Sequence, residues 1–314
     1  KNLELLRENV NSDLVITTGE TIPENNQIEI LVAGRPSEEM IKACTRLNIV
    51  IIPWAGVPPD TRELMKNYPQ VLLFNLHHNA TTTAELAVGL LFSAAKSIVS
   101  MDSAFRQKDW RPRYADPFVM RLEEKKAVIF GYGEIGSHIG KILAAIGMDV
   151  WGIRRSIEED YQDLLGVHIT GIDSFDELLS DCDVLMVSAP LTAETRGFLD
   201  RNRLRMMKPG SVLVNVGRGE IIDQAALYQA LKEKQITAAG LDVWYNYPNS
   251  EKNRGFTPPS LYPFHKLDNV VLSPDRGGLC NESDELRMKA LGKLINNYIN
   301  GEELPNQINK ELGY

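Results

Sequence analysis

The run Ala127-Val128-Ile129-Phe130 leads straight into Gly131-Tyr132-Gly133-Glu134-Ile135-Gly136, and a helical pattern follows as far as residue 146. A second β-rich run begins at residue 150, so the glycines stand between a strand and a helix. In that context the spacing G-x-G-x-x-G is typical of a turn that binds a dinucleotide. Gly131 permits the tight turn, Gly133 lets the backbone approach a pyrophosphate, and Gly136 lets the helix pack on the strand. The phosphates would lie at the helix N-terminus, beside Glu134 and Ile135.

The residues that end the second strand indicate which dinucleotide is bound. An acidic residue at this place accepts the ribose hydroxyls of NAD and would repel a 2′-phosphate. This chain instead has Arg154, Arg155 and Ser156. Two guanidinium groups and a hydroxyl bind a phosphate through charge-assisted hydrogen bonds. We therefore predict NADP as the cofactor, and NAD as the alternative if these arginines only form a solvated loop face.

The alternation of strand-like and helical segments extends through the whole chain. In the first half, β-rich runs occur at residues 28–32, 49–52 and 71–73, with helical patterns at 38–47 and 60–67. In the second half, six runs occur at residues 127–130, 150–153, 184–188, 211–216, 238–243 and 270–272. This rhythm predicts an α/β protein: a doubly wound parallel sheet of the Rossmann type for the cofactor, and a second, flavodoxin-like α/β domain for the substrate.

Three longer segments suggest how the domains are organised. Residues 81–105 have apolar spacing typical of one long helix that links the domains. Residues 244–267 are rich in proline and too long for a plain connection, so they are predicted to form an active-site loop. Residues 284–299 form an amphipathic pattern that we expect to return to the first domain. The substrate domain would then comprise residues 1–100 and 290–314, and the cofactor domain residues 101–289.

Composition excludes several classes of function. With 314 residues and 43% hydrophobic content, the chain is long enough for two cores. The net charge of -8 disfavours nucleic acid or an anionic membrane as a partner, because either would be repelled. The three cysteines lie far apart and form no zinc or disulfide pattern, so we predict no metal site and a reducing, cytoplasmic location. The longest apolar stretch, residues 86–95, is too short to cross a bilayer.

Several motifs outside the glycine turn resemble one protein family. They lie between residues 51 and 278: Ala55-Gly56-Val57, Thr83-Ala84-Glu85, Ala189-Pro190-Leu191-Thr192 with Glu194-Thr195-Arg196-Gly197, Val214-Asn215-Val216-Gly217-Arg218-Gly219, and Gly240-Leu241-Asp242-Val243. Together they resemble the D-2-hydroxyacid dehydrogenases, which include glyoxylate and hydroxypyruvate reductases, phosphoglycerate dehydrogenase and formate dehydrogenase. The resemblance implies NAD(P)-dependent oxidation of 2-hydroxy acids or reduction of 2-keto acids, a small-molecule substrate and a homodimer built on the cofactor domains.

The resemblance also implies roles for individual residues. Arg218 would grip the substrate carboxylate and polarise the reacting carbonyl, which suits the planar fork of its guanidinium. The substrate would further be held by the loop Ala55, Gly56 and Val57 and by Asn79. Cofactor contacts beyond the glycine turn and the arginines are expected at Ala189, Pro190, Thr195, Val216, Gly217, Arg218, Asp242, Asp275 and Gly277.

The proton-transfer residues of the family are missing. The segment that should contain Pro-His reads Pro274-Asp275, and the position of the orienting glutamate, five residues after Asp242, is Tyr247. Carbonyl reduction needs a proton for the new alkoxide, and an aspartate has an ordinary pKa of about 3.9, so it is ionised at neutral pH. Asp275 would act as the acid only if burial raised its pKa. Alternatively, Asp275 would pair with Arg218 and block the anion site.

Three hypotheses follow from this departure. The first is an active reductase in which Asp275 and Tyr247, with Arg218, carry out the chemistry, or in which His78 or His265 supplies the proton. The second is a non-catalytic dinucleotide-binding sensor or interaction protein on the same scaffold. The third is an active-site variant of an ordinary dehydrogenase, altered by a His to Asp change. Of these we favour the first.

Overall fold

In the computed structural model, which describes every residue except 20, 25, 116, 117, 156 and 314, the chain divides into two units. Unit 1 comprises Lys1–Asn79 and Leu279–Tyr314, and unit 2 comprises Ala80–Gly278. The sequence pattern placed the boundaries near residues 100 and 290. The division falls earlier because the helix that starts at residue 80 buries Ala84, Ala87 and Leu91 in the core of unit 2.

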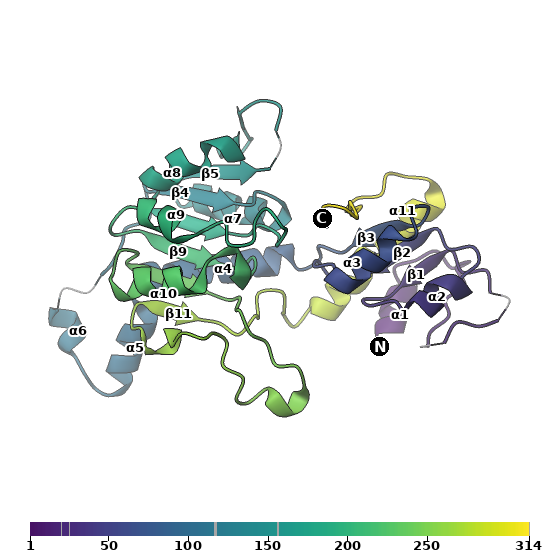
Figure 1. Cartoon of the computed structure of the whole chain (residues 1–314), viewed down its shortest axis with the longest axis horizontal. Coiled ribbons are helices and arrows are strands. Elements are labelled where there is room, and N and C mark those ends of the chain that lie inside the picture. The colour runs from purple at the N-terminus through teal and green to yellow at the C-terminus, as the bar shows by residue number, and fades with distance from the viewer. Residues whose placement is uncertain (20, 25, 116–117, 156, 314) are drawn as a thin grey trace. The chain divides into compact units, whose positions relative to one another are not determined.

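Unit 1 is a three-stranded parallel sheet with helices on both faces (Figure 1). Its elements are α1 (Asn2–Arg7), β1 (Ile30–Val32), α2 (Glu38–Ala43), β2 (Ile49–Ile52), α3 (Pro59–Lys66), β3 (Leu72–Asn75) and α11 (Ser283–Asn300). Along β2, Ile49 and Ile51 face a core shared with α1 and α11, whereas Val50 and Ile52 face a core shared with α2 and α3. This alternation is the period of two expected of a strand that is buried on both faces.

Unit 2 is built on an eight-stranded sheet in the order β11-β10-β9-β8-β4-β5-β7-β6. The strands are β4 (Lys126–Phe130), β5 (Asp149–Arg154), β6 (Tyr161–Gln162), β7 (His168–Gly171), β8 (Val184–Val187), β9 (Val212–Asn215), β10 (Ala238–Leu241) and β11 (Val270–Leu272). All neighbouring pairs are parallel except β6 with β7. The sequence predicted six of these strands. It missed β6 and β7, which are short and partly polar and carry little apolar signal.

Helices cover both faces of this sheet (Figure 1). One face packs on α4 (Ala80–Ala95) and α7 (Glu134–Ala145), and the other on α8 (Phe175–Asp181), α9 (Arg201–Met206) and α10 (Gln224–Lys232). The remaining elements are α5 (Ile98–Arg106), α6 (Arg111–Tyr114) and the short 3-10 helices η1 (Ile172–Ser174), η2 (Gly219–Ile221), η3 (Glu251–Asn253) and η4 (Phe264–Lys266). Residues 244–267 are otherwise irregular, as the prolines indicated.

The long helix expected over residues 81–105 is broken. It ends at Ala95 and resumes as α5 at Ile98 after a bend of 65°. Ser97 lies at φ 51°, the Lys96 ammonium donates to the carbonyl of Met120 (2.6 Å), and the Ser97 hydroxyl donates to that of Phe118 (2.7 Å). These bonds to a returning segment fix the bend, and local apolar spacing does not reveal them.

Within the described residues, no single helix has the length and apolar character needed to cross a membrane, although α4 and α5 taken together as a bent pair meet that test.

Candidate active site at the carboxyl ends of the parallel strands

The glycine turn after β4 lies where the strand order reverses. From β4 the chain continues through β5 and β7 on one side and through β8, β9, β10 and β11 on the other. In such sheets ligands bind beyond the carboxyl ends of the strands at this reversal, because the loops on its two sides separate there. Most of the motifs singled out in the sequence follow β4, β5, β8, β9, β10 or β11, so they share this edge of unit 2.

Steric constraints explain two of the three glycines in the turn. Gly131 has φ 99°, and a Cβ there would lie 2.4 Å from the backbone nitrogen of Ala189 in the loop after β8. A Cβ on Gly136 would lie 2.4 Å from the Gly131 carbonyl oxygen. Gly217, after β9, meets the same loop, because its Cβ would lie 2.7 Å from the Ala189 carbonyl oxygen. The loops after β4, β8 and β9 therefore touch through backbone atoms.

Gly133 differs from its neighbours because nothing in the described part of the chain lies within 4 Å of the position its Cβ would take. It is the N-cap residue of α7, a 12-residue helix. Because glycine has no side chain, no side-chain hydrogen bond caps the first turn of this helix. Open space over a glycine, beside free N–H groups and the positive end of a helix dipole, fits the pyrophosphate of a dinucleotide. Gly133 and Glu134 are exposed and Ile135 is partly buried. Their contact with a cofactor stays a prediction.

The arginines after β5 are already engaged. Arg154 donates from Nε to the carbonyl of Tyr132 in the glycine turn (3.0 Å), and the residue is exposed. Arg155 pairs with Glu194 (3.1 Å), a residue of the loop after β8. This ion pair joins the two loops that flank the glycine turn. Both arginines lie where a 2′-phosphate was predicted, while Ser156 lies outside the described residues.

The loop after β8 holds its own predicted contacts in place. The Thr195 hydroxyl donates to the carbonyl of Pro190 (2.6 Å) and accepts from the amide of Thr192 (2.8 Å). Pro190 is exposed and Ala189 is buried. After β9, Val216 is also buried, and the amide of Gly217 donates to the side chain of Asn215 (3.0 Å). These hydrogen bonds fix the backbone of the loops that follow β8 and β9.

Asp242, which follows β10, is only 2% exposed and organises the loop after β11. Its carboxylate accepts hydrogen bonds from the amides of Arg276 (2.8 Å) and Gly277 (2.9 Å) and from the Ser273 hydroxyl. Its carbonyl accepts from the amide of Asp275 (2.8 Å). All three donors to the carboxylate belong to the loop after β11 in unit 2. Asp242 therefore has a structural role, which is to hold this loop in its conformation. Its predicted contact with the nicotinamide stays a prediction.

Asp275, held in this loop by Asp242, has a left-handed backbone conformation with φ 56°. Asp275 is exposed, yet partial loss of solvent around its carboxyl raises the pKa above its ordinary value, and the negative charge of Asp242 raises the pKa further. The positive charge of Arg218 and a hydrogen bond from Tyr247 lower the pKa and so oppose part of this shift. The balance favours the protonated acid more than an aspartate in water would.

Tyr247 comes from the irregular loop and is 47% exposed. Its hydroxyl oxygen accepts from the amide of Trp244 (3.1 Å), so the hydroxyl proton is available to Asp275. The Trp244 indole donates to the carbonyl of Ser273 (2.8 Å), which ties this loop to the one after β11. Burial raises the pKa of Tyr247, and the charge of Asp275 adds to the rise.

Arg218 is exposed at the same edge. Its Nη1 donates to the carbonyl of Gly217 (2.7 Å), and within the described part of the chain it forms no ion pair. A Cβ on Gly219, the residue after Arg218, would lie 2.3 Å from the carbonyl oxygen of Trp244. The Trp244 amide binds the Tyr247 hydroxyl, and its indole binds the carbonyl of Ser273, two residues before Asp275. The loops that carry Arg218, Tyr247 and Asp275 are therefore neighbours. No ion pair between Asp275 and Arg218 is formed among the described residues, and the alternative in which Asp275 fills the anion site stays a hypothesis.

In unit 1, the predicted substrate contacts also follow strand ends. Ala55, Gly56 and Val57 come after β2, and the side chain of Asn75, at the end of β3, donates to the carbonyl of Ala55. Asn79 is the last residue of this part of unit 1. His78, one of the alternative proton donors, has its pKa lowered to about 4 by burial and by the charges of Arg287 and His77, so it is neutral at physiological pH.

The other alternative donor, His265, is not at the carboxyl edge. It belongs to η4, which precedes β11, whereas Asp275 follows β11. The two residues therefore lie beyond opposite ends of the same strand. Of the proton donors considered for unit 2, only Asp275 and Tyr247 are brought together with Arg218.

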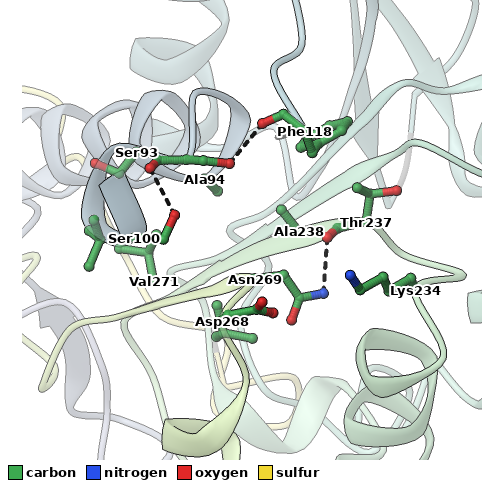
Figure 2. A pocket seen from close by; sticks show the side chains of 13 residues that line it. Ser93, Ala94, Ser100, Phe118, Lys234, Thr237, Ala238, Asp268, Asn269 and Val271 are labelled. Atoms are coloured by element: carbon green, nitrogen blue, oxygen red, sulfur yellow. Dashed lines mark hydrogen bonds between the residues drawn. The ribbon is translucent and has the colours of Figure 1, made fainter. Parts of the chain in front are cut away.

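A separate cavity of about 260 Å³ opens at the opposite edge of the same sheet (Figure 2). It lies by the first residues of β10 and β11, Ala238 and Val270, and is lined by hydroxyls of α4 and α5 and by Lys234, Asp268 and Asn269. Asn269 donates to the carbonyl of Thr237 there (2.9 Å). Because it lies by the amino ends of the strands, this cavity is not part of the predicted cofactor site.

The sequence missed several residues that organise the site. Ser273 and Trp244 build the loop contacts around Asp275, Glu194 binds Arg155, and Asp163 binds Tyr132. Their partners lie at least 29 residues away in the chain. A single sequence does not pair such distant groups, although Glu194 lies within one of the family motifs.

Comparison with known proteins agrees with this architecture. Residues 88–277 match the family model described as D-isomer specific 2-hydroxyacid dehydrogenase, NAD binding domain. A glyoxylate reductase from Aeropyrum pernix is 34% identical over 73% of this chain and 67% of its own length. A D-3-phosphoglycerate dehydrogenase from Methanocaldococcus jannaschii is 27% identical over 94% of this chain. The chain spans only 54% of that enzyme, and 45% of an Archaeoglobus fulgidus D-3-phosphoglycerate dehydrogenase.

Solved structures share the fold. A D-isomer specific 2-hydroxyacid dehydrogenase from Xanthobacter autotrophicus Py2, in complex with NADPH and MES, has a TM-score of 0.79 at 23% identity, covering 100% of this chain and 95% of its own. An acyclic imino acid reductase in complex with NADPH and D-Arg has a TM-score of 0.70 at 26% identity, covering 89% of this chain and 84% of its own. With a Rossmann sheet, an open glycine turn and a family model that matches most of unit 2, this chain belongs to the D-isomer specific 2-hydroxyacid dehydrogenase family of oxidoreductases and carries its domain for binding a nicotinamide dinucleotide.

Proposed function

We propose that this protein reduces a small 2-keto acid to the 2-hydroxy acid, with NADPH as the cofactor. The observation that carries the proposal is the gathering of Arg218, Tyr247 and Asp275 at the sheet edge that also holds the open glycine turn. The bound dinucleotide would supply the hydride. The residues of the chain would hold the acid, orient it and deliver the proton.

Arg218 would bind the substrate carboxylate and polarise the keto oxygen. Its guanidinium is exposed and has no ion-pair partner among the described residues, so it is available to an anion. A planar guanidinium forms two parallel hydrogen bonds with a carboxylate, which also fixes the direction of the adjoining carbonyl. The substrate contacts expected of unit 1, at residues 55–57 and Asn79, stay predictions.

Asp275 would give the proton. When the carbonyl carbon accepts a hydride, the oxygen becomes an alkoxide, and protonated Asp275 converts it to a hydroxyl and is left as a carboxylate. Water then returns the proton to Asp275. The raised pKa of Asp275 favours the protonated form needed at the start. Tyr247 donates a hydrogen bond to the carboxylate left after transfer, and so it would orient the acid.

The preference for NADP would rest on the arginines after β5. Arg154 is exposed and donates from Nε to the Tyr132 carbonyl, and Arg155 lies next in the chain. Each charge-assisted contact with a 2′-phosphate contributes about 1.5–3 kcal/mol. A 2′-phosphate that binds Arg155 would replace Glu194 as its partner, so the net gain in binding free energy at Arg155 is smaller. We therefore expect NADP to bind more tightly than NAD, by roughly tenfold to a hundredfold.

The test is the oxidation of NADPH, followed by absorbance, against a series of short 2-keto acids between pH 5 and 8. Turnover that is faster at acid pH, together with tighter binding of NADP than NAD in calorimetric titrations, supports the proposal. If the cofactor binds but no 2-keto acid is reduced at any pH, even after Asp275→His, the non-catalytic sensor is the better account. If the wild-type chain reduces no 2-keto acid at any pH but Asp275→His does so at neutral pH, the His to Asp change is an inactivating one.

A second candidate function is the reduction of a 2-imino acid, and Asp275 is the observation that favours it. A carboxylate beside the reacting group repels a keto acid but stabilises a positively charged iminium, C=NH₂⁺. The iminium nitrogen already carries its protons, so hydride addition at carbon gives a neutral amine and no proton donor is needed. The structural likeness to an acyclic imino acid reductase agrees with this candidate.

The two candidates differ in the direction of their pH dependence. Keto acid reduction requires protonated Asp275 and slows as the pH rises through its pKa. Iminium reduction requires the carboxylate and becomes faster over the same range. Adding ammonia or a primary amine to the 2-keto acid series, with mass spectrometry to distinguish a 2-amino acid from a 2-hydroxy acid, separates them.

For the assembly, we infer that a second copy of the chain covers α5 and α6. Neither helix buries a residue, and the segment exposes Phe105, Trp110 and Tyr114 to 56%, 60% and 83%. Light scattering should give twice the chain mass, and Trp110→Glu should give the monomer. A wild-type monomer at micromolar concentration would contradict this.

A further inference from the structure

The second residue of the glycine turn, Tyr132, is buried beneath the turn. It is 6% exposed, and its ring fills the space left by two glycines. A Cβ on Gly152 in β5 would lie 2.4 Å from the ring, and one on Gly140 in α7 would lie 2.8 Å from it. The ring therefore packs between the helix and the strand that flank the cofactor turn. A smaller apolar residue would fill this space less well.

The hydroxyl of Tyr132 reaches the segment that follows β5. It donates to Oδ2 of Asp163 (3.0 Å). The other oxygen, Oδ1, accepts from the amides of Leu165 (2.9 Å) and Val167 (3.0 Å). Asp163 therefore closes the turn between β6 and β7 and binds that turn to Tyr132. Asp163 lies nine residues after Arg154, at the far end of the segment that follows β5.

The backbone of Tyr132 binds the beginning of the same segment. Its amide donates to the carbonyl of Ile153 (2.8 Å), and its carbonyl accepts from Nε of Arg154 (3.0 Å). The segment from Arg154 to Asp163 is thus tied at both ends to one residue. The bond to Arg154 also sets the direction in which the two Nη groups of that guanidinium point.

We propose that Tyr132 is a positioning residue for cofactor selectivity: through Asp163 and Arg154 it holds the segment after β5 in the form that receives the 2′-phosphate of NADP. This proposal rests on the proposed function, because it assigns the 2′-phosphate to that segment. It extends the proposed function to Tyr132 and Asp163, whose side chains would not contact the 2′-phosphate themselves.

A purely structural role gives a different expectation. If Tyr132 only filled space, its loss would lower stability and weaken the binding of NADP and NAD alike, because both share the pyrophosphate and the turn. A positioning role affects the 2′-phosphate alone. The ratio of the dissociation constants for NADP and NAD is therefore the informative quantity, since effects common to both cofactors cancel in it.

The experiment is calorimetric titration of NADP and NAD into the full chain and into Tyr132→Phe, which keeps the ring and removes only the hydroxyl. We expect NADP to bind about three- to tenfold more weakly, as for the loss of one hydrogen bond, and NAD to change less than twofold. Asp163→Ala should have the same effect, and Asp163→Asn, which retains an oxygen for the turn amides, should restore most of the ratio. Tyr161→Phe is the matched control, because Tyr161 lies in the same segment and is 46% exposed.

An unchanged ratio in both Tyr132→Phe and Asp163→Ala would overturn the proposal, as would an equal loss for both cofactors. If the wild-type chain binds NAD as tightly as NADP, the proposed preference itself fails. The positioning role would then be supported only by a change in the ratio from its wild-type value. If Tyr132→Phe does not fold, the same criteria apply to Asp163→Ala.

Discussion

The two ends of the carboxyl edge of unit 2 are built in different ways. At the glycine turn, backbone atoms shape the site: Gly131, Gly136 and Gly217 have no room for a Cβ, and Gly133 lies under open space. At the other end, side chains shape it: Asp242 accepts three hydrogen bonds, and Tyr247 and Arg218 act on Asp275 through their charge and hydrogen bonding. At the glycine turn, steric contacts allow few substitutions. At the end that holds Asp275, one acid can be replaced by another while the surrounding hydrogen bonds are kept.

This difference predicts that chemistry can change at Asp275 without loss of the scaffold. Asp275→His should increase 2-keto acid reduction at neutral pH by about 10²- to 10⁴-fold, the usual contribution of a positioned acid, and move the optimum towards neutrality. Steady-state kinetics across pH, with cofactor affinity as the control, checks this. If activity does not change, the proton comes from another group, and Tyr247→Phe becomes the next variant to test.

Arg218 is the group at this end that should be irreplaceable. Arg218→Ala should lower kcat/KM by about 10²- to 10³-fold, both in the wild-type chain and when combined with Asp275→His, because no other residue of the proposed site polarises the carbonyl. Arg218→Lys keeps the charge but loses the paired hydrogen bonds, and it should recover only part of the loss. The Tm should stay near wild type, because the guanidinium is exposed. Full activity in Arg218→Ala would remove it from the proposed site.

The glycine turn supplies a matched pair of substitutions. Gly131→Ala places a Cβ against Ala189 and forces an alanine to φ 99°, so we expect a loss of about 2–4 kcal/mol in the free energy of unfolding. Gly133→Ala meets nothing in the described part of the chain and should fold normally, yet weaken the binding of either dinucleotide. Denaturant unfolding and calorimetry measure the two effects. Tight cofactor binding by Gly133→Ala would show that the space over Gly133 is not the pyrophosphate site.

Much of the fold could be predicted from the sequence, because local patterns determine it. The strands β2 and β11 were predicted with the bounds they have, and the glycine turn was placed between β4 and α7. The break between α4 and α5 was missed, because it depends on hydrogen bonds from Lys96 and Ser97 to residues more than 20 positions away. Strand β6, at the edge of the sheet, and its neighbour β7 were missed because they are partly polar and lack an apolar pattern.

The candidate site divides in the same way. The family resemblance predicted that Arg218, Asp242 and Asp275 share one site, and in the structure each of them follows a parallel strand of unit 2. Nothing in the sequence indicated that Asp242 uses its carboxylate to bind the loop after β11, or that Arg155 is paired with Glu194. Both depend on contacts between loops that are distant in the chain. The roles of these residues in binding and catalysis stay predictions.

The smallest expected effect concerns the pair that joins the two loops beside the glycine turn. Glu194→Gln removes the ion pair with Arg155 and a negative charge near the predicted 2′-phosphate, so NADP should bind about two- to fivefold more tightly, as for one exposed ion pair, while NAD should not change. Asp176→Asn removes a similar ion pair, with Arg203, and serves as the control. If both cofactors respond equally, the effect is not at the 2′-phosphate.

The pH dependence of kcat/KM for a 2-keto acid tests most directly whether Asp275 is the acid of this site. Since its pKa is raised above the ordinary value and the protonated form is required, kcat/KM should be constant at acid pH and fall as the pH rises through that raised pKa. In Asp275→Asn this ionisation should disappear and the remaining rate should be low. A flat profile in the wild type, or the same fall in Asp275→Asn, would contradict the account.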